Sequence, residues 1–159
     1  MIDKYRQLNE FGKNLLSKEL LVEALLYISL SAKSIVESDR CSLFIYDKEA
    51  NELWTSLADN EQKITIPFDM GIVGQTVRVR KAIVENNAYD NPNFMSDVDI
   101  KTGYYTQNIL TSPIFDSKRE VVAVLQLLNK ESGFDKNDVE FINFFSHFIS
   151  GFIESKNLE

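Results

Sequence analysis

Two glycines at the start of a short helical segment have the spacing of an anion site. Gly71 and Gly74 flank Ile72 and Val73 in the run GIVGQTVRVR. Glycine lets the backbone approach a ligand closely, and the free N–H groups of a helix start favour negative charge. The segment therefore predicts a site for an anionic group such as a phosphate. The alternative is that both glycines only permit a tight turn.

Polar residues of a later, irregular stretch form a second candidate group. Asp99, Thr102 and Thr106 are spaced by three and four residues, so they share one face if the stretch is helical. A carboxylate and two hydroxyls could hydrogen-bond to the edge of a purine and to a ribose. The alternative is a solvated loop in which these side chains form local capping bonds, as residues of these types often do.

Two more polar residues interrupt apolar runs of period two. Alternation places Ser42 on the same strand face as Phe44, and Gln126 on the same face as Val122 and Leu128. A buried polar group without a partner costs about 1–3 kcal/mol, so Gln126 needs one. A ligand is one candidate partner, and ordered water or the backbone of a covering segment is the other.

Residues suited to catalysis are scarce. Cys41 is the only cysteine and His147 the only histidine. A single thiol has no resolving partner for redox chemistry, and a free cysteine is most often a core residue. One histidine is a poor basis for acid–base catalysis or for a metal site. We therefore expect no enzyme activity, no metal and no required cofactor.

The chain alternates between two hydrophobic periods, and these predict the elements that position the candidate residues. Asp135 is a good N-cap for the last helix, and Phe134 can pack on Val139 as a hydrophobic staple. Spacings of three and four predict helices at residues 3–16, 18–37, 71–80 and 136–155, and period two predicts strands at 41–47, 52–57, 63–66, 82–85, 109–115 and 121–128.

This order of elements predicts an α+β fold. We expect a six-stranded antiparallel sheet with the helices at 18–37 and 136–155 packed on one face. Residues 86–107 are rich in Asn, Asp, Tyr and Gly and have no steady period. A connection of that length usually carries function, and here it must cover the other face of the sheet. We therefore expect a ligand pocket between the sheet and this lid.

Length and charge narrow the class of protein. The chain has 159 residues, which fits one domain, and its net charge is −7. Phosphate backbones are bound by clustered Lys and Arg, so nonspecific binding to nucleic acid or anionic membrane is not expected. The start has no signal-peptide pattern, and no long apolar run occurs. These features predict a cytoplasmic location.

Several local strings occur in a characteristic order and spacing. They are RCSLF at 40–44, IP followed by GIVG at 66–74, NAY with P and F at 87–94, VD, TGY, T and NIL at 98–110, and LLNK with F and D at 127–138. Together they resemble GAF domains of the phosphodiesterase and adenylyl-cyclase type that bind cyclic nucleotides, and the resemblance covers about residues 20–155. Val139 stands where the family signature has its final acid, and Asn87 stands where the family usually has Asp.

The resemblance implies a regulatory sensor with the GAF fold, whose best single ligand is a purine cyclic nucleotide, either cyclic AMP or cyclic GMP. It also implies that Asn129, Lys130, Phe134 and Asp138 form a structural motif, in which the lysine and the second acid pair away from the ligand. We expect the pocket to be lined by Ser42, Ile72, Val73, Asp99, Thr102, Thr106 and Gln126.

The expected organisation is a signalling helix at residues 1–17, a GAF domain at 18–155 and a tail at 156–159 that leads to an output domain. The first helix is amphipathic, and Phe144 lies beside the main apolar stripe of the last helix. We therefore expect a homodimer through the terminal helices. The alternative functions are a ligand-free dimerisation and signal-relay module, whose own side chains fill the pocket, and a sensor of a different metabolite.

Overall fold

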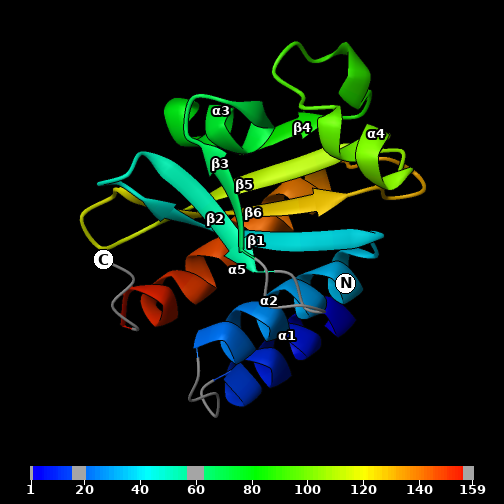
Figure 1. The fold of residues 1–159 in the computed structure, drawn as a ribbon. Helices are drawn as coiled ribbons and strands as arrows, with labels where there is room; N and C mark the ends of the chain where they lie inside the picture. The colour runs from blue at the N-terminus through cyan, green and yellow to red at the C-terminus, as the bar shows by residue number, and fades with distance from the viewer. Residues whose placement is uncertain (1, 16–20, 57–62, 156–159) are drawn as a thin grey trace.

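A computed structural model describes residues 2–15, 21–56 and 63–155 of the chain (Figure 1). Two expectations lie outside the described residues: the start of the second helix at residues 18–20 and the tail at 156–159.

Six strands of the described residues form one antiparallel sheet. They are β1 Arg40–Asp47, β2 Glu52–Ser56, β3 Lys63–Pro67, β4 Ile83–Glu85, β5 Ile109–Phe115 and β6 Val121–Leu128. Their order across the sheet is β3-β2-β1-β6-β5-β4, and all neighbours pair antiparallel. The last strand therefore inserts between β1 and β5, so β1 and β6 occupy the centre of the sheet.

Three long helices cover one face of the sheet, which we call the helix face. They are α1 Ile2–Leu15, α2 Leu21–Val36 and α5 Lys136–Ser155, and all lie below the sheet in Figure 1. Alternate residues of β1 and β6 meet the apolar stripes of α2 and α5, and full burial of one large side chain contributes about 1.5–3 kcal/mol. This core includes Ile28, Leu43, Ile45, Leu125, Leu127, Ile142, Phe145 and Ile149.

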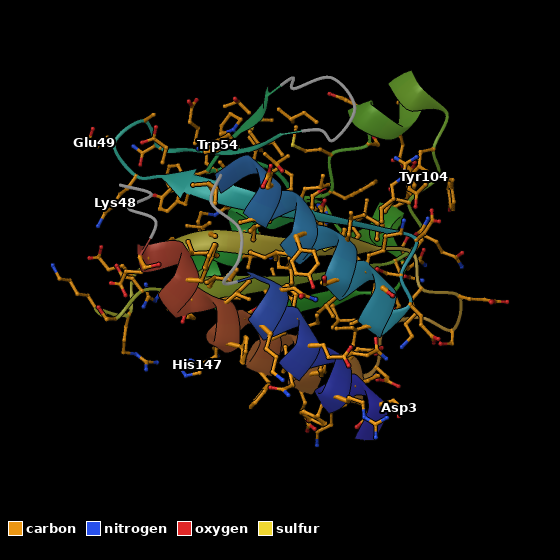
Figure 2. The ribbon with its side chains drawn as sticks, turned by 90° about the horizontal axis from the view of Figure 1, so that it is seen from below. Asp3, Lys48, Glu49, Trp54, Tyr104 and His147 are labelled. Carbon is orange, nitrogen blue, oxygen red and sulfur yellow. The ribbon has the colours of Figure 1, made fainter. Side chains whose placement is uncertain are left out.

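α1 packs into this core through a close approach at a glycine. A Cβ atom at Gly12 would lie 2.6 Å from the Phe148 ring of α5, so a larger residue there would displace this ring. The neighbouring Phe11 is 2% exposed and lies between Tyr27 of α2 and Phe145 of α5, at ring distances of 5.2 and 5.0 Å. Figure 2 shows α1 lying against both helices. Gly12 therefore allows α1 to pack closely against α5.

The opposite side of the sheet, which we call the lid face, carries shorter elements. Helix α3 (Gly71–Val79) packs on it, and the lid, residues 86–107, contains a 3-10 turn (Ala88–Asp90) and helix α4 (Asp97–Thr102). Figure 1 shows α3, β4 and α4 on the side away from α1, α2 and α5. Phe44, Val73 and Val124 form the apolar contact between α3 and the sheet.

One expectation about strand faces is wrong. Val122 was expected on the face of Gln126, but it packs against the core of the helix face. Ile114 pairs with Ala123 and Phe115 with Val121, which leaves Val122 as an extra residue in β6. Such a bulge resets the alternation, and Val121 takes the position on the lid face instead.

The predicted fold class is confirmed: an α+β fold with a six-stranded antiparallel sheet and with α2 and α5 on one face. The strands at 109–115 and 121–128 and the helix at 136–155 have the expected bounds, and the others differ by one residue at the ends that the structure describes. No helix in the described part of the chain is long and apolar enough to cross a membrane.

Candidate functional site

A row of polar residues crosses the centre of the lid face. Ser42 of β1 pairs in register with Gln126 of β6, and Gln126 pairs with Thr111 of β5. Cross-strand partners point to the same face of a sheet, so the three side chains are neighbours. The next residues of β6 on this face are Val124 and Leu128, which pack in apolar clusters. The polar row is therefore a local feature of an apolar surface.

The Thr111 end of the row is closed by a hydroxyl pair. Thr111 Oγ1 lies 2.6 Å from Thr76 Oγ1 of α3, and both residues are fully buried. Thr76 donates its proton to the carbonyl oxygen of Ile72 at 2.8 Å. Since each hydroxyl has one proton, Thr111 must donate to Thr76. The pair fixes α3 over the sheet and leaves the Thr111 oxygen as an acceptor.

The other end of the row is open. Ser42 and Gln126 are half-buried, and neither side chain hydrogen-bonds to a residue that the structure describes. Gln75 of α3 adds a buried Oε1 atom that likewise has no partner among the described residues. Buried or half-buried polar atoms are normally satisfied, so these three side chains are candidates for contact with a ligand or water.

The start of α3 combines free backbone donors with close contacts. Its N-cap, Met70, forms no side-chain capping bond, and no side chain among the described residues accepts a hydrogen bond from the first amides of the helix. Gly71 has a φ of 72°, and the Met95 sulfur of the lid lies 3.1 Å from the position of a Cβ atom there. A Cβ at Gly74 would lie 2.5 Å from the carbonyl oxygen of Phe68. Both glycines are therefore required by the backbone conformation, which is what the tight-turn alternative predicted. The amides at the start of α3 are also suited to an anion, so the anion site stays a prediction.

Ile72 and Val73 are buried residues of α3 that pack against different parts of the sheet. Ile72 packs with Ile109 and Ala88, beside Leu128. Val73 packs in the cluster of β1, β2 and β6. Both therefore contact the lid face on which the polar row lies.

Asp99 is 7% exposed and joins three parts of the lid. Its carboxylate accepts hydrogen bonds from Thr106 N at 2.8 Å, Thr106 Oγ1 at 2.9 Å and Tyr89 Oη at 2.7 Å. The bond to Asp99 raises the pKa of Tyr89 to about 12, so the phenol remains a donor. Tyr89 also stacks on Tyr105, with ring centroids 5.1 Å apart.

The structure therefore brings the predicted residues together in two groups. Ser42 and Gln126 are adjacent on the sheet, and Asp99 and Thr106 are bonded within the lid. No described hydrogen bond joins one group to the other. Thr102 is the last residue of α4, and its side chain is not among the parts of the chain that the structure describes.

The four residues of the expected structural motif secure the segment between β6 and α5. Lys130 Nζ donates to Asp138 Oδ1 at 2.6 Å, and Asp138 is 1% exposed. Asp138 Oδ2 accepts from Asp135 N, and Asp135 Oδ1 accepts from Asp138 N, each at 2.9 Å. This exchange is a capping box that begins α5. Phe134 is 4% exposed, and its backbone is bonded on both sides by the Asn86 amide.

Asn129 is bonded more extensively than the sequence suggested. Its Oδ1 accepts from Gln107 N at 2.7 Å and Asn108 N at 3.2 Å, and its Nδ2 donates to Tyr104 Oη at 2.9 Å and Tyr105 O at 2.8 Å. The end of β6 thereby holds the segment at which the lid returns to the sheet.

The remaining reactive side chains do not form a site. Cys41 packs against the core of the helix face, and burial raises the pKa of its thiol well above the ordinary value. His147 lies exposed on α5 and points away from the molecule (Figure 2). Among the described residues, no group of three His, Cys, Asp or Glu could hold a metal ion.

Sequence reasoning missed Thr76, Thr111 and Tyr89. Thr111 had a detectable signal, because it follows Ile109 with period two on a strand whose residues are mostly apolar. Thr76 lies four residues after Ile72, which places it on the same face of α3. Tyr89 stood in a string used only for the family resemblance, and its bond to Asp99 had no signal in the sequence.

The sheet, with long helices on one face and a short helix and a lid on the other, defines a small α+β domain. The model of the GAF domain family matches residues 21–153, which is most of the chain. The chain belongs to the GAF domain family, whose fold is that of a regulatory sensor.

Curated relatives in this family include the cGMP-specific 3′,5′-cyclic phosphodiesterases of Drosophila ananassae and Drosophila virilis. Each is 31% identical to this chain over 144 aligned residues, which cover 78% of the chain. The chain spans only 12% of the first relative's length and 16% of the second's.

Solved structures with the same fold come from proteins with different activities. The GAF domain of a phosphoenolpyruvate-protein phosphotransferase from Coxiella burnetii superposes with a TM-score of 0.85 at 18% identity, covering 97% of this chain and 94% of that one. A free methionine-R-sulfoxide reductase from Neisseria meningitidis superposes with a TM-score of 0.78 at 16% identity, covering 96% and 89%. At these identities the similarity shows the fold alone.

Proposed function

We propose that this domain binds a purine cyclic nucleotide between the lid and the lid face of the sheet, and relays its presence through the terminal helices. The observation that carries the proposal is the open end of the polar row. Ser42 and Gln126 are neighbours on an apolar sheet face, and neither bonds to a described residue. A polar ligand on that face would supply the missing partners.

The elements around the row match the parts of a cyclic nucleotide. The uncapped amides at the start of α3 suit the cyclic phosphate, because a helix N-terminus favours an anion. Ile72 and Val73 supply an apolar middle, and Asp99, Thr102 and Thr106 supply polar groups for the purine or ribose. Asp99 already accepts three bonds, so a ligand there would use its remaining acceptor capacity or displace the lid contacts.

The curated relatives support this choice of ligand, because they are named as cGMP-specific phosphodiesterases. They also support a linked output domain, since this chain corresponds to a small part of their length. We infer that the domain regulates rather than catalyses. The sulfoxide reductase shows that this fold also occurs in an enzyme, but the only thiol of this chain, Cys41, is half-buried against the helix-face core.

Isothermal titration calorimetry with cyclic AMP and with cyclic GMP tests the proposal. We expect one of the two to bind the purified domain with a dissociation constant below one millimolar. The matching 5′-monophosphate is the control, because it keeps the purine and ribose but opens the cyclic phosphate. Absence of heat from both cyclic nucleotides at millimolar concentration would refute the cyclic-nucleotide assignment.

A second candidate function is a dimerisation and relay module without a small ligand. Side chains of α3, the lid and β5 fill part of the space on the lid face: Ile72, Ala88 and Ile109 are buried together, with Phe94 and Leu128 packed against them. The terminal helices expose Tyr5, Phe144 and Phe148 by 44–50%. Calorimetry separates the candidates, because this module would bind no nucleotide and would still dimerise.

A further inference from the structure

Tyr104 lies where the lid ends and contacts two other parts of the molecule. Its Oη donates to Asp39 Oδ2 at 2.6 Å, and Asn129 Nδ2 donates to the same Oη at 2.9 Å. The guanidinium of Arg40 lies over the Tyr104 ring, 3.7 Å from its centroid. Figure 2 shows Tyr104 between the lid and the end of α2. One side chain thus joins the lid exit, the end of β6 and the turn from α2 to β1.

The turn that Tyr104 contacts is tied to α2. Ser38 N donates to Lys33 O in the last turns of α2, and Asp39 N donates to the carbonyl oxygens of Leu128 and Asn129. Asp39 therefore lies between the last turn of the helix and the end of β6. A displacement of the Asp39 carboxylate therefore acts on a short segment that is hydrogen-bonded to α2 and to the end of β6.

The lid side of Tyr104 is tied to the candidate ligand site. Two residues further along, Thr106 is held by Asp99 of α4 through its N–H and its hydroxyl. The Asn129 side chain forms four hydrogen bonds with this segment, to residues 104, 105, 107 and 108, which is the most that an amide side chain can form. Asp99 is therefore connected to Asp39 by its hydrogen bonds to Thr106, by the backbone between Thr106 and Tyr104, and by the hydrogen bond of Tyr104 to Asp39.

We propose that Tyr104 is the positioning residue that couples the lid to α2. The coupling passes through its hydroxyl, which is shared by Asp39 and Asn129. It rests on the proposed function only in taking a nucleotide as the input, because the contacts are present without one. A lid position that removes Tyr104 from Asp39 frees the α2–β1 turn, and a change at Asp39 equally alters the lid.

The coupling is tested first without ligand, by NMR-detected amide exchange in Tyr104→Phe. This variant keeps the ring under Arg40 and removes the bonds of the hydroxyl to Asp39 and Asn129. We expect exchange about tenfold faster at the amides of Asp39 and Gln107, the usual scale for loss of a bond to a charged group. Tyr105→Phe is the matched control. It removes the adjacent hydroxyl, which bonds to no described residue, and should change exchange at Asp39 by less than twofold.

The reciprocal variant tests the direction from the turn to the lid. Asp39→Ala leaves the lid sequence unchanged, yet it should accelerate exchange at Gln107 and Asn108. The double variant should exchange no faster than Tyr104→Phe alone, because both changes break one contact. Additive effects, or an unchanged Asp39 amide in Tyr104→Phe, would overturn the proposal.

Saturating cyclic GMP provides the third arm. In the unmodified chain we expect added protection both in the lid and at residues 38–40, and in Tyr104→Phe only in the lid. Equal protection of residues 38–40 in both proteins would overturn the coupling. If the unmodified chain binds no cyclic nucleotide, the proposed function fails, and the two experiments without ligand still decide the coupling.

Discussion

Ser42 and Gln126 are polar side chains that do not serve the fold through any described hydrogen bond. A half-buried amide on an apolar sheet face loses contact with water and gains nothing in return unless a partner arrives. Thr111, the third member of the row, differs because its hydroxyl bonds to Thr76. Stability and ligand binding should therefore respond differently to changes at the two ends of the row.

Gln126→Leu tests this distinction at the residue that carries the proposal. Leucine has a similar size and no polar atoms, so we expect the free energy of unfolding to stay equal or rise by up to about 1 kcal/mol. Binding of the cyclic nucleotide should weaken by about 1–2 kcal/mol. Urea unfolding and calorimetry measure the two effects. Thr111→Val is the control and should lower stability by about 1 kcal/mol. A large loss of stability in Gln126→Leu with unchanged binding would contradict the account.

Asp135 makes a prediction about pH. The N–H of Asp138 that it accepts, with further help from Lys130, lowers the pKa of Asp135 below its ordinary value. A carboxyl with a lowered pKa in the folded state stabilises above its unfolded pKa of about 4, and this contribution disappears as the pH falls through the folded value. Asp135→Asn should therefore reduce the decline in unfolding free energy below about pH 4.

The control for the pH prediction is Glu140→Gln. It removes an exposed carboxyl of the same helix that hydrogen-bonds to no described residue. Urea unfolding between pH 3 and pH 7 compares the three proteins. If the unfolding free energy of Asp135→Asn falls below pH 4 as steeply as that of the unmodified chain, the predicted titration of Asp135 is wrong.

At the scale of elements, α3 is positioned by its glycines. The carbonyl oxygen of Phe68 occupies the place of a Cβ at Gly74, and backbone cannot move aside as a flexible side chain does. We expect Gly74→Ala to lower the free energy of unfolding by about 1–3 kcal/mol. Gly151→Ala in α5 is the matched control, because no atom lies within 4 Å of its Cβ position. It should raise stability by about 0.5–1 kcal/mol. Thermal or urea unfolding gives both values, and equal changes would be contrary to this packing.

The elements with clear hydrophobic periods could be predicted from the sequence, including α5 and the two strands before it. The lid could not, because its 3-10 turn at Ala88–Asp90 and helix α4 are short and are held by bonds such as Asp99 to Thr106 rather than by an apolar stripe. The bulge at Val122 escaped for a different reason: alternation along one strand contains no information about its partner's register.

The same contrast applies to the candidate site. Period two grouped Ser42 with Phe44 and Gln126 with Leu128, each within its own strand, and only the pairing of β1 with β6 shows that Ser42 and Gln126 share a face. The hydroxyl pair of Thr76 and Thr111 joins residues 35 positions apart in different elements, and no local pattern reports such a contact. The resemblance to GAF domains indicated which lid residues to consider, and only the structure shows that Asp99 is hydrogen-bonded to Thr106.

At the scale of the whole molecule, the terminal helices expose an aromatic surface. Phe144 is 50% exposed and lies 5.8 Å from the Tyr5 ring, so α1 and α5 present it together. We expect a dimer through these helices at tens of micromolar, and a monomer in Phe144→Glu with the fold intact. Light scattering with circular dichroism measures both. His147→Glu adds the same charge on the same exposed helix and should leave the dimer in place. A monomer in the unmodified chain would contradict the expected dimer.

The central claim is that the polar row of the lid face receives the ligand, and chemical-shift mapping tests it most directly. Isotope-labelled protein is titrated with cyclic GMP and, separately, with cyclic AMP. The account predicts that one nucleotide shifts the signals of Ser42, Thr111 and Gln126 together with the amides of residues 71–74, while the core of the helix face changes little. Shifts confined to the helix face, or no shifts at millimolar nucleotide, would contradict it.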